Sequence, residues 1–225
     1  REPHSLHATS FGTICPYETP DGGNIGLRKN FTIFTQVTFG TNSEPLVRCL
    51  FENNVKNIHN IEINELNNSS KVFLNENIVG IHYNPNILVY KLKLLRRNAL
   101  INIYTSIIWY KVENIVKITT TSGRLSRPLL IVDNKNLLIT TDTVQKIKDN
   151  ILNWKYLIGG TRNLESKTEA YNDYDDKYHF KNETIEYLEN HKGVIEYLDT
   201  EEINSCLIAM MPDDLLKPNN KLYNY

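Results

Sequence analysis

Cysteine is scarce in this chain, and long apolar runs are missing from it. Its 225 residues include only Cys15, Cys49 and Cys206, which lie far apart. An odd and widely spaced set argues against a disulfide framework and is typical of a reducing compartment. No apolar run approaches the ~20 residues of a membrane span, and no signal peptide is visible. We therefore expect an intracellular protein that has no membrane partner.

The chain also carries almost no net charge. Its formal charge is −1 at pH 7, so no global basic field attracts nucleic acid. Basic residues predominate between residues 86 and 127, and acidic residues between 165 and 202. Such asymmetry indicates either an interaction surface or ordinary solvated faces. The length suits one large or two small domains, and the start at Arg1 rather than methionine predicts a piece of a longer chain.

No cluster of acidic residues has the spacing of a catalytic metal site. His4, His7 and Cys15 lie close in sequence, but structural zinc usually needs four nitrogen or sulfur ligands. No fourth ligand follows at a suitable interval. We therefore predict that this chain contains no catalytic residue and no metal site, and that it has no catalytic activity by itself.

Proline and glycine concentrate between residues 12 and 30. Proline fixes φ and glycine permits positive φ, so this stretch cannot be a long helix or a central strand. Pro20 suits the first corner of a turn, and Gly22 suits a left-handed position. The sequence predicts a loop of fixed path that projects three polar side chains, Glu18, Asp21 and Asn24. These side chains either face a functional site or only stabilise the turn.

The same stretch resembles the signature C-P-x-E-T-P-E-G-x-N-I-G-L, which it matches at ten positions from Cys15 to Leu27, with Asp21 for the usual glutamate. This signature is found in the second-largest (β-type) subunit of multisubunit DNA-dependent RNA polymerases. The lead-in from His7 to Gly12 is similar to that family's H-P-T/S-x-Y/F/W-G. Further resemblance follows in the same order along the chain and is missing only from residues 53–70 and 161–180.

Within that family the chain looks most like the subunit of a large eukaryotic DNA virus, and a nuclear polymerase from an AT-rich protist is the second possibility. The abundance of Asn, Ile, Lys and Tyr suits an AT-rich genome. One departure concerns the residue after the signature leucine, which in bacterial enzymes is apolar and lines the rifamycin pocket. Here it is Arg28, which puts sensitivity to rifamycins in doubt.

The resemblance implies an α+β fold: a fork-derived segment of loop and strand, then a mixed αβ domain with antiparallel hairpins and short helices. It implies that residues 1–44 are the C-terminal part of the fork, residues 45–205 the external 2 domain, and residues 206–225 the start of a connection toward the hybrid-binding domain. It further implies that five fork residues lie near the active centre: Glu18, Thr19, Pro20, Asp21 and Asn24.

The resemblance also implies a role in making RNA from ribonucleoside triphosphates on a DNA template, as a nucleotidyltransferase complex. The expected partners are the largest polymerase subunit, the other subunits, the template DNA and the RNA–DNA hybrid. Mg²⁺ would be held mainly by the largest subunit. A viral factory, a virion or a nucleus is the expected location. The alternative is a stand-alone module that binds protein or nucleic acid without catalysis.

The clearest predicted helix spans residues 84–99, with Asn84 as its cap and Leu88, Leu92 and Leu95 on one face. Four arginines of this part are possible interface residues: Arg96, Arg97, Arg124 and Arg127. For Arg96 and Arg97 the alternative is an ordinary solvated helix charge. Further helices are predicted at 45–53, 143–157 and 183–190, and strands at 31–39, 71–74, 78–82, 101–112, 114–121, 124–132, 194–198 and 206–210. Residues 161–180 show no period, and 212–225 are expected to fray.

Overall fold

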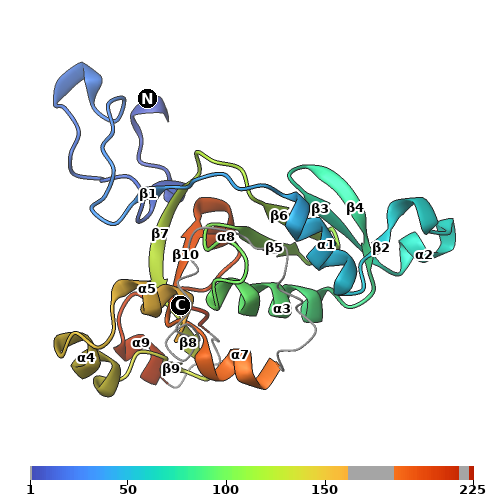
Figure 1. The fold of residues 1–225 in the computed structure, drawn as a ribbon. Coiled ribbons are helices and arrows are strands. Elements are labelled where there is room, and N and C mark those ends of the chain that lie inside the picture. Colours follow the sequence, from blue (N-terminus) through green and yellow to red (C-terminus); the bar gives the residue numbers. More distant parts are fainter. Residues whose placement is uncertain (1, 162–184, 218–222) are drawn as a thin grey trace.

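A computed structural model describes residues 2–161, 185–217 and 223–225 of the chain. It shows helices with mixed and antiparallel sheets, which confirms the predicted α+β class (Figure 1). The N-terminal residues stand apart as a loop-rich segment that joins the rest at β1 (Gln36–Val37) (Figure 1). We call residues 2–43 the N-terminal segment and the remaining described residues the body. The predicted aperiodic region 161–180 lies almost wholly outside the described residues.

A five-stranded sheet forms one half of the body. Its strand order is β2-β4-β3-β6-β5, and β3 runs parallel to β6 while the other neighbours are antiparallel. The strands predicted at 71–74 and 78–82 are confirmed as an antiparallel hairpin, in which Asn75 and Glu76 turn the chain with φ of 48° and 70°. The strands are β2 (Lys56–Asn57), β3 (Ser70–Leu74), β4 (Asn77–His82), β5 (Ser106–Tyr110) and β6 (Ile115–Thr119).

Helix α3 (Pro85–Arg97) packs against this sheet, as Figure 1 shows. Leu88, Leu92 and Leu95 are buried as predicted, together with the apolar face of α1 (Glu44–Glu52). Pro85 occupies the first turn, where the missing N–H costs nothing. The helix ends two residues early, because Ala99 takes a positive φ of 52°. Asn84 lies at the N-cap position but makes no capping bond with its side chain.

A three-stranded sheet, in the order β1-β7-β10, joins the ends of the chain. In it β7 (Leu125–Leu130) pairs along its length with β10 (Ile195–Asp199) and at its start with β1. The strands predicted at 114–121 and 124–132 are joined through Ser122 and Gly123, a connection typical of a hairpin. That pairing is wrong, since β6 and β7 belong to different sheets. Pro128 lacks the N–H that a ladder bond needs, which predicts an edge position or a bulge. It lies opposite Tyr197 and past the residues that β1 covers, so one side of β7 is an edge there.

Three further predictions of elements were wrong. The helix expected at 143–157 is two helices, because Asn150 takes a φ of 55° and breaks it. Residues 31–39 contain only the short β1, and residues 206–210 form no strand. The chain end does not fray at Tyr225, which is buried. The remaining elements are η1 (Glu2–His4), η2 (Ala8–Ser10), η3 (Gly22–Asn24), η4 (Ile58–Asn60), α2 (Ile63–Asn67), β8 (Val132–Asp133), β9 (Asn136–Leu137), α4 (Thr141–Lys148), α5 (Trp154–Gly159), α7 (Ile185–His191), α8 (Thr200–Asn204) and α9 (Asp213–Leu216).

Candidate functional site

The loop that carries the predicted site is closed at its base by backbone hydrogen bonds. Cys15 N donates to Asn30 O at 2.8 Å, and Thr32 N donates to Thr13 O at 3.0 Å. Between these bonds Ile14 and Phe31 form an isolated antiparallel bridge. Residues 15–30 are therefore an excursion with fixed ends, as the proline and glycine content predicts.

Side chains brace the excursion across its middle. Thr19 donates its Oγ1 hydrogen to Arg28 O at 3.1 Å and accepts from Gly26 N at 2.8 Å. The side-chain amide of Asn30 donates to Glu18 O at 3.2 Å. Gly22 takes a φ of 76°, the left-handed position that the sequence predicts. These bonds fix the backbone that carries Glu18 and Asp21.

The first turn of the chain packs against the far arm of the loop. The Nδ1 atom of His4 donates to Ile25 O at 2.8 Å. Gly26 has a φ of 74°, and a Cβ atom there would lie 2.4 Å from His4 O. Only glycine permits this close approach, so any side chain at position 26 would push the first turn of the chain away from the loop.

The five predicted active-centre residues occupy the outer part of this braced loop. The side chains of Glu18, Asp21 and Asn24 are exposed, and Thr19 and Pro20 are half-buried. Thr19 acts within the loop through its two hydrogen bonds. The other polar groups are free to meet a partner, and the fixed backbone lowers the entropy cost of doing so. Their contact with an active centre stays a prediction.

The N-terminal segment has no apolar core of its own. Its only buried side chains are Ser10, Thr13 and Thr38, all polar. Ile33 is 96% exposed and Phe39 74%. Ten large apolar side chains of this segment are exposed in all: Leu6, Phe11, Tyr17, Ile25, Leu27, Phe31, Ile33, Phe34, Val37 and Phe39. Such a density of exposed apolar residues is typical of a surface that another polypeptide covers.

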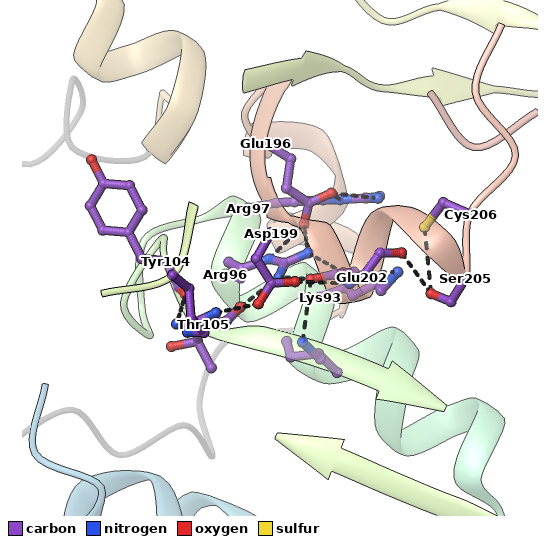
Figure 2. Close-up of polar contacts among 12 residues, drawn as sticks. Lys93, Arg96, Arg97, Tyr104, Thr105, Glu196, Asp199, Glu202, Ser205 and Cys206 are labelled. Carbon is purple, nitrogen blue, oxygen red and sulfur yellow. Dashed lines mark hydrogen bonds and ion pairs between the residues drawn. The ribbon is translucent and has the colours of Figure 1, made fainter. Parts of the chain in front are cut away.

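Arg96 behaves differently from both predictions made for it. Its side chain is 1% exposed and lies in the centre of the ion-pair cluster that Figure 2 shows. It binds Glu202 through two parallel hydrogen bonds of 2.8 Å and Glu196 through Nε at 2.8 Å. It also donates to Thr105 O at 2.6 Å. The solvated role is wrong, and no donor is left over for another subunit.

Arg97 and Lys93 complete this cluster at its rim. Arg97 donates to the second carboxylate oxygen of Glu196 at 3.1 and 3.2 Å, and Lys93 lies 3.3 Å from Glu202. The hydroxyl of Tyr225 donates to the same oxygen of Glu196 at 2.7 Å. Three cations thus share two fully buried carboxylates, and α3 is fixed to β10 and α8 (Figure 2).

Electrostatics in this cluster favour the charged forms. Burial alone would raise the pKa of Glu196, but the charges of Arg96 and Arg97 outweigh it and hold that pKa below its usual value. Burial would likewise lower the pKa of Arg96, and the attraction of Glu196 and Glu202 raises it instead. Burial, followed by the charge of Glu196, raises the pKa of Tyr225, so its hydroxyl stays a donor. The arrangement is a structural clamp with no exposed reactive group.

Arg124 is also paired inside the chain. It lies 2.5 Å from Oδ2 of Asp199 and donates to the backbone oxygen of Tyr104 at 2.7 Å. The other carboxylate oxygen of Asp199 accepts from Glu202 N at 2.8 Å and caps α8. The structure therefore gives no support to an interface role for Arg96, Arg97 or Arg124.

Arg127 is the exception among these arginines. Its guanidinium carbon lies 4.8 Å from the ring centre of Phe11, in the geometry of a cation–π contact. Its Nε is buried without a hydrogen-bond partner, and no carboxylate pairs with it in the described part of the chain. Arg127 remains a candidate interface residue.

Sequence reasoning missed Glu196, Asp199 and Glu202 as structural partners, because it grouped them with the acidic surface of residues 165–202. One signal was available. Glu196 lies between apolar Ile195 and Tyr197 in a strand buried on both faces, where a carboxylate needs a cation. The partner itself is about a hundred residues away in sequence and could not be found from spacing.

Three family models match in order along the chain: RNA polymerase Rpb2, domain 3, at residues 1–37; RNA polymerase Rpb2, domain 4, at residues 72–133; and RNA polymerase Rpb2, domain 5, at residues 186–224. A DNA-directed RNA polymerase II subunit RPB2 from Encephalitozoon cuniculi is 32% identical over 92% of this chain and 15% of its own length.

Two other relatives extend this similarity. DNA-directed RNA polymerase II subunit 2 of Arabidopsis thaliana is 32% identical over 96% of this chain and 16% of its own length. DNA-directed RNA polymerase subunit Rpo2 of Saccharolobus solfataricus is 28% identical over 98% of this chain and 18% of its own length. The chain thus spans less than a fifth of the length of the relatives that it matches.

Proposed function

Because the chain belongs to the family of second-largest subunits of DNA-directed RNA polymerase, we propose that it serves in template-directed RNA synthesis as part of that multisubunit enzyme. The observation that carries this proposal is the character of the N-terminal segment. The segment has no apolar core of its own, and its hydrogen-bonded loop exposes Glu18. Such a segment suits a larger assembly that covers its apolar side chains and uses its polar ones.

The proposed division of labour follows the two parts of the structure. Residues 1–44 would be the end of the fork, beside the active centre and the downstream DNA. Residues 45–205 would be the external domain, whose core and buried ion pairs suit a structural role. Residues 206–225 would begin the connection toward the hybrid-binding domain. The hydrogen bond from Tyr225 to Glu196 of β10 supports a close link between this connection and the external domain.

We assign Glu18 the main role in the loop. A carboxylate on a backbone held by Thr19 and Asn30 can accept charge-assisted hydrogen bonds from a mobile element of the largest subunit. Asp21 and Asn24 lie on the same exposed part of the loop and would add contacts to that element. The largest subunit, the other polymerase subunits, the template DNA and the RNA–DNA hybrid are the proposed partners.

The described residues do not supply a Mg²⁺ site. In residues 2–161, 185–217 and 223–225 no group of three or more His, Cys, Asp or Glu side chains is placed to hold a metal ion. The Mg²⁺ of the complete enzyme would be held mainly by the largest subunit.

The proposed location of the enzyme depends on whether it is cellular or viral. A nucleus is the location proposed for a cellular enzyme, and a viral factory, a virion or a host nucleus for a viral one. The possibility of a viral origin rests on the resemblance and on the abundance of Asn, Ile, Lys and Tyr, which suits an AT-rich genome. Imaging the tagged subunit in its native cell would distinguish these cases. In the part of the chain that the structure describes, no helix is long and apolar enough to cross a membrane.

A non-catalytic binding module is the alternative function, and the exposed apolar surface would suit it too. Purification of the full-length protein from its native cell separates the two. The proposal predicts that template-dependent RNA synthesis co-purifies with it, and that residues 1–225 alone yield no RNA with template, nucleotides and Mg²⁺. A full-length protein that co-purifies with no RNA synthesis would refute the proposal.

Glu18→Ala tests the role of the loop within the enzyme. Loss of a charge-assisted bond of about 1.5–3 kcal/mol that acts only in the transition state would slow nucleotide addition by roughly 10–150-fold. Assembly and DNA affinity should change little, since they rest on large interfaces and many phosphate contacts. Glu186→Ala on α7 is the matched control, an exposed carboxylate of the body that should leave the rate unchanged. Equal addition rates for Glu18→Ala and wild type would assign Glu18 to the turn.

A further inference from the structure

Arg127 combines a half-buried side chain with a charge that no carboxylate pairs in the described part of the chain. It lies on β7, one residue after Ser126, which pairs with Gln36 of β1. Its side chain passes so close to Gly12 that a Cβ atom there would lie 1.6 Å from a terminal guanidinium nitrogen. With the ring of Phe11 also near, the side chain is held at the junction of the N-terminal segment and the body.

The three other candidate arginines show what Arg127 lacks. Arg96, Arg97 and Arg124 each bind a carboxylate of this chain. For Arg127 burial lowers the pKa of the guanidinium, and no carboxylate among the described residues offsets this effect. A partly buried cation without an anionic partner is unfavourable unless something supplies that partner. Among the described residues nothing supplies it.

The surroundings of Arg127 indicate the kind of partner. Phe11, which stacks on it, is 45% exposed, and β1 beside it carries the exposed Val37. Phe39 follows two residues later. Apolar side chains gain by contact with other apolar side chains, whereas a nucleic-acid backbone would be matched by several neighbouring cations. The surface therefore suits a polypeptide better than a phosphate backbone.

We propose that Arg127 anchors a docking surface for a polypeptide segment outside these 225 residues, one that places an Asp or Glu carboxylate between apolar residues. The carboxylate would accept from the guanidinium of Arg127, and the apolar residues would cover Phe11, Val37 and Phe39. This inference rests on the proposed function in one respect: the covering segment would belong to the assembled polymerase, so the experiment uses that complex.

Carbodiimide coupling in the assembled enzyme tests the anchor. Arg127→Lys keeps the charge and supplies an amine that forms an amide with a carboxylate in direct contact. Mass spectrometry should find that amide with an Asp or Glu outside residues 1–225, flanked by apolar residues. Arg124→Lys is the matched control and should couple to Asp199, its partner in the structure. Coupling of the control without any coupling at position 127 would overturn the proposal, as would coupling only within residues 1–225.

Photocrosslinking from position 11 is a second test, which applies also if the Arg127→Lys variant does not assemble. A photoreactive benzophenone side chain replaces Phe11 in the assembled enzyme. It should form an adduct with the same kind of segment, acidic and apolar, and give equal yields with and without nucleic acid. Adducts with nucleic acid, or adducts confined to residues 1–225, would contradict the proposal. RNA synthesis by the same preparation is measured separately, so failure of the docking surface and failure of the proposed function are distinguished.

Discussion

The N-terminal segment and the body are stabilised in opposite ways. The body buries a continuous set of leucines, isoleucines and valines between α1, α3 and the five-stranded sheet. The N-terminal segment buries no large apolar side chain in residues 2–43 and exposes ten. Its path is fixed instead by turns, glycines and hydrogen bonds such as those of Thr19. The difference suggests that the body can hold its own shape, whereas the segment needs a partner to cover its apolar surface.

The buried ion pairs should give the largest effect on the body. Arg96→Ala leaves Glu196 and Glu202 buried with one cation fewer, and breaking such a pair typically costs about 3–5 kcal/mol. Urea unfolding of residues 1–225 measures the change in free energy. Arg48→Ala, which removes an exposed pair with Glu44, is the control and should cost less than about 0.5 kcal/mol. Equal costs for the two variants would show that the cluster does not hold the body together.

Truncation of the core should come next. Leu92 is fully buried, so Leu92→Ala should cost about 2–5 kcal/mol of unfolding free energy. The same truncation in the N-terminal segment, Ile33→Ala, removes a side chain that is almost fully exposed and should cost less than about 0.5 kcal/mol in the isolated chain. A large loss from Ile33→Ala would mean that the segment has a core after all.

Acid should weaken the body through Glu196. Its pKa in the folded state lies below the usual 4.5 because Arg96 and Arg97 outweigh burial. A depressed carboxyl pKa contributes stability above the unfolded value, and this is lost as pH falls from about 4.5 toward the folded pKa. Unfolding free energies of Glu196→Gln should fall less steeply over that range than those of the wild type. Identical slopes would exclude Glu196 as the cause.

The last prediction concerns the N-terminal segment, where Arg28 follows the signature leucine, and it involves no change in stability. Arg28 is exposed on the loop, and a charge there is costly to bury against an apolar ligand. We predict that the enzyme resists rifamycins. Dose–response curves of RNA synthesis should show no inhibition at concentrations that stop a bacterial polymerase, and inhibition there would refute the prediction. Arg28→Ile should restore some sensitivity if the charge is the cause.

The sequence predicted local features well and distant pairings poorly. The buried face of α3 followed from the spacing of Leu88, Leu92 and Leu95, and the braced loop followed from Pro20 and Gly22. The separation of β6 from β7 did not follow, because a Ser-Gly turn is typical of a hairpin and nothing local shows that the next strand joins another sheet. The break at Asn150 was hidden because its neighbours continue a helical apolar pattern.

The candidate site residues likewise include some that the sequence could predict and some that it could not. The exposure of Glu18, Asp21 and Asn24 could be read from a loop of proline and glycine. The burial of Arg96 could not, because a charge near the end of an amphipathic helix is usually solvated and its two carboxylates come from residues far along the chain. Local patterns determine what a segment can form, and only the tertiary structure determines which charges it buries.

Hydrogen exchange tests the contrast between the two parts most directly. Amide protection of residues 2–43 and of residues 44–133 should be measured in the isolated chain and in the assembled polymerase. We predict strong protection of the core strands and of α3 in both, and protection of the N-terminal segment that rises substantially only on assembly. Equal protection of the segment in the isolated chain and in the enzyme would contradict the account.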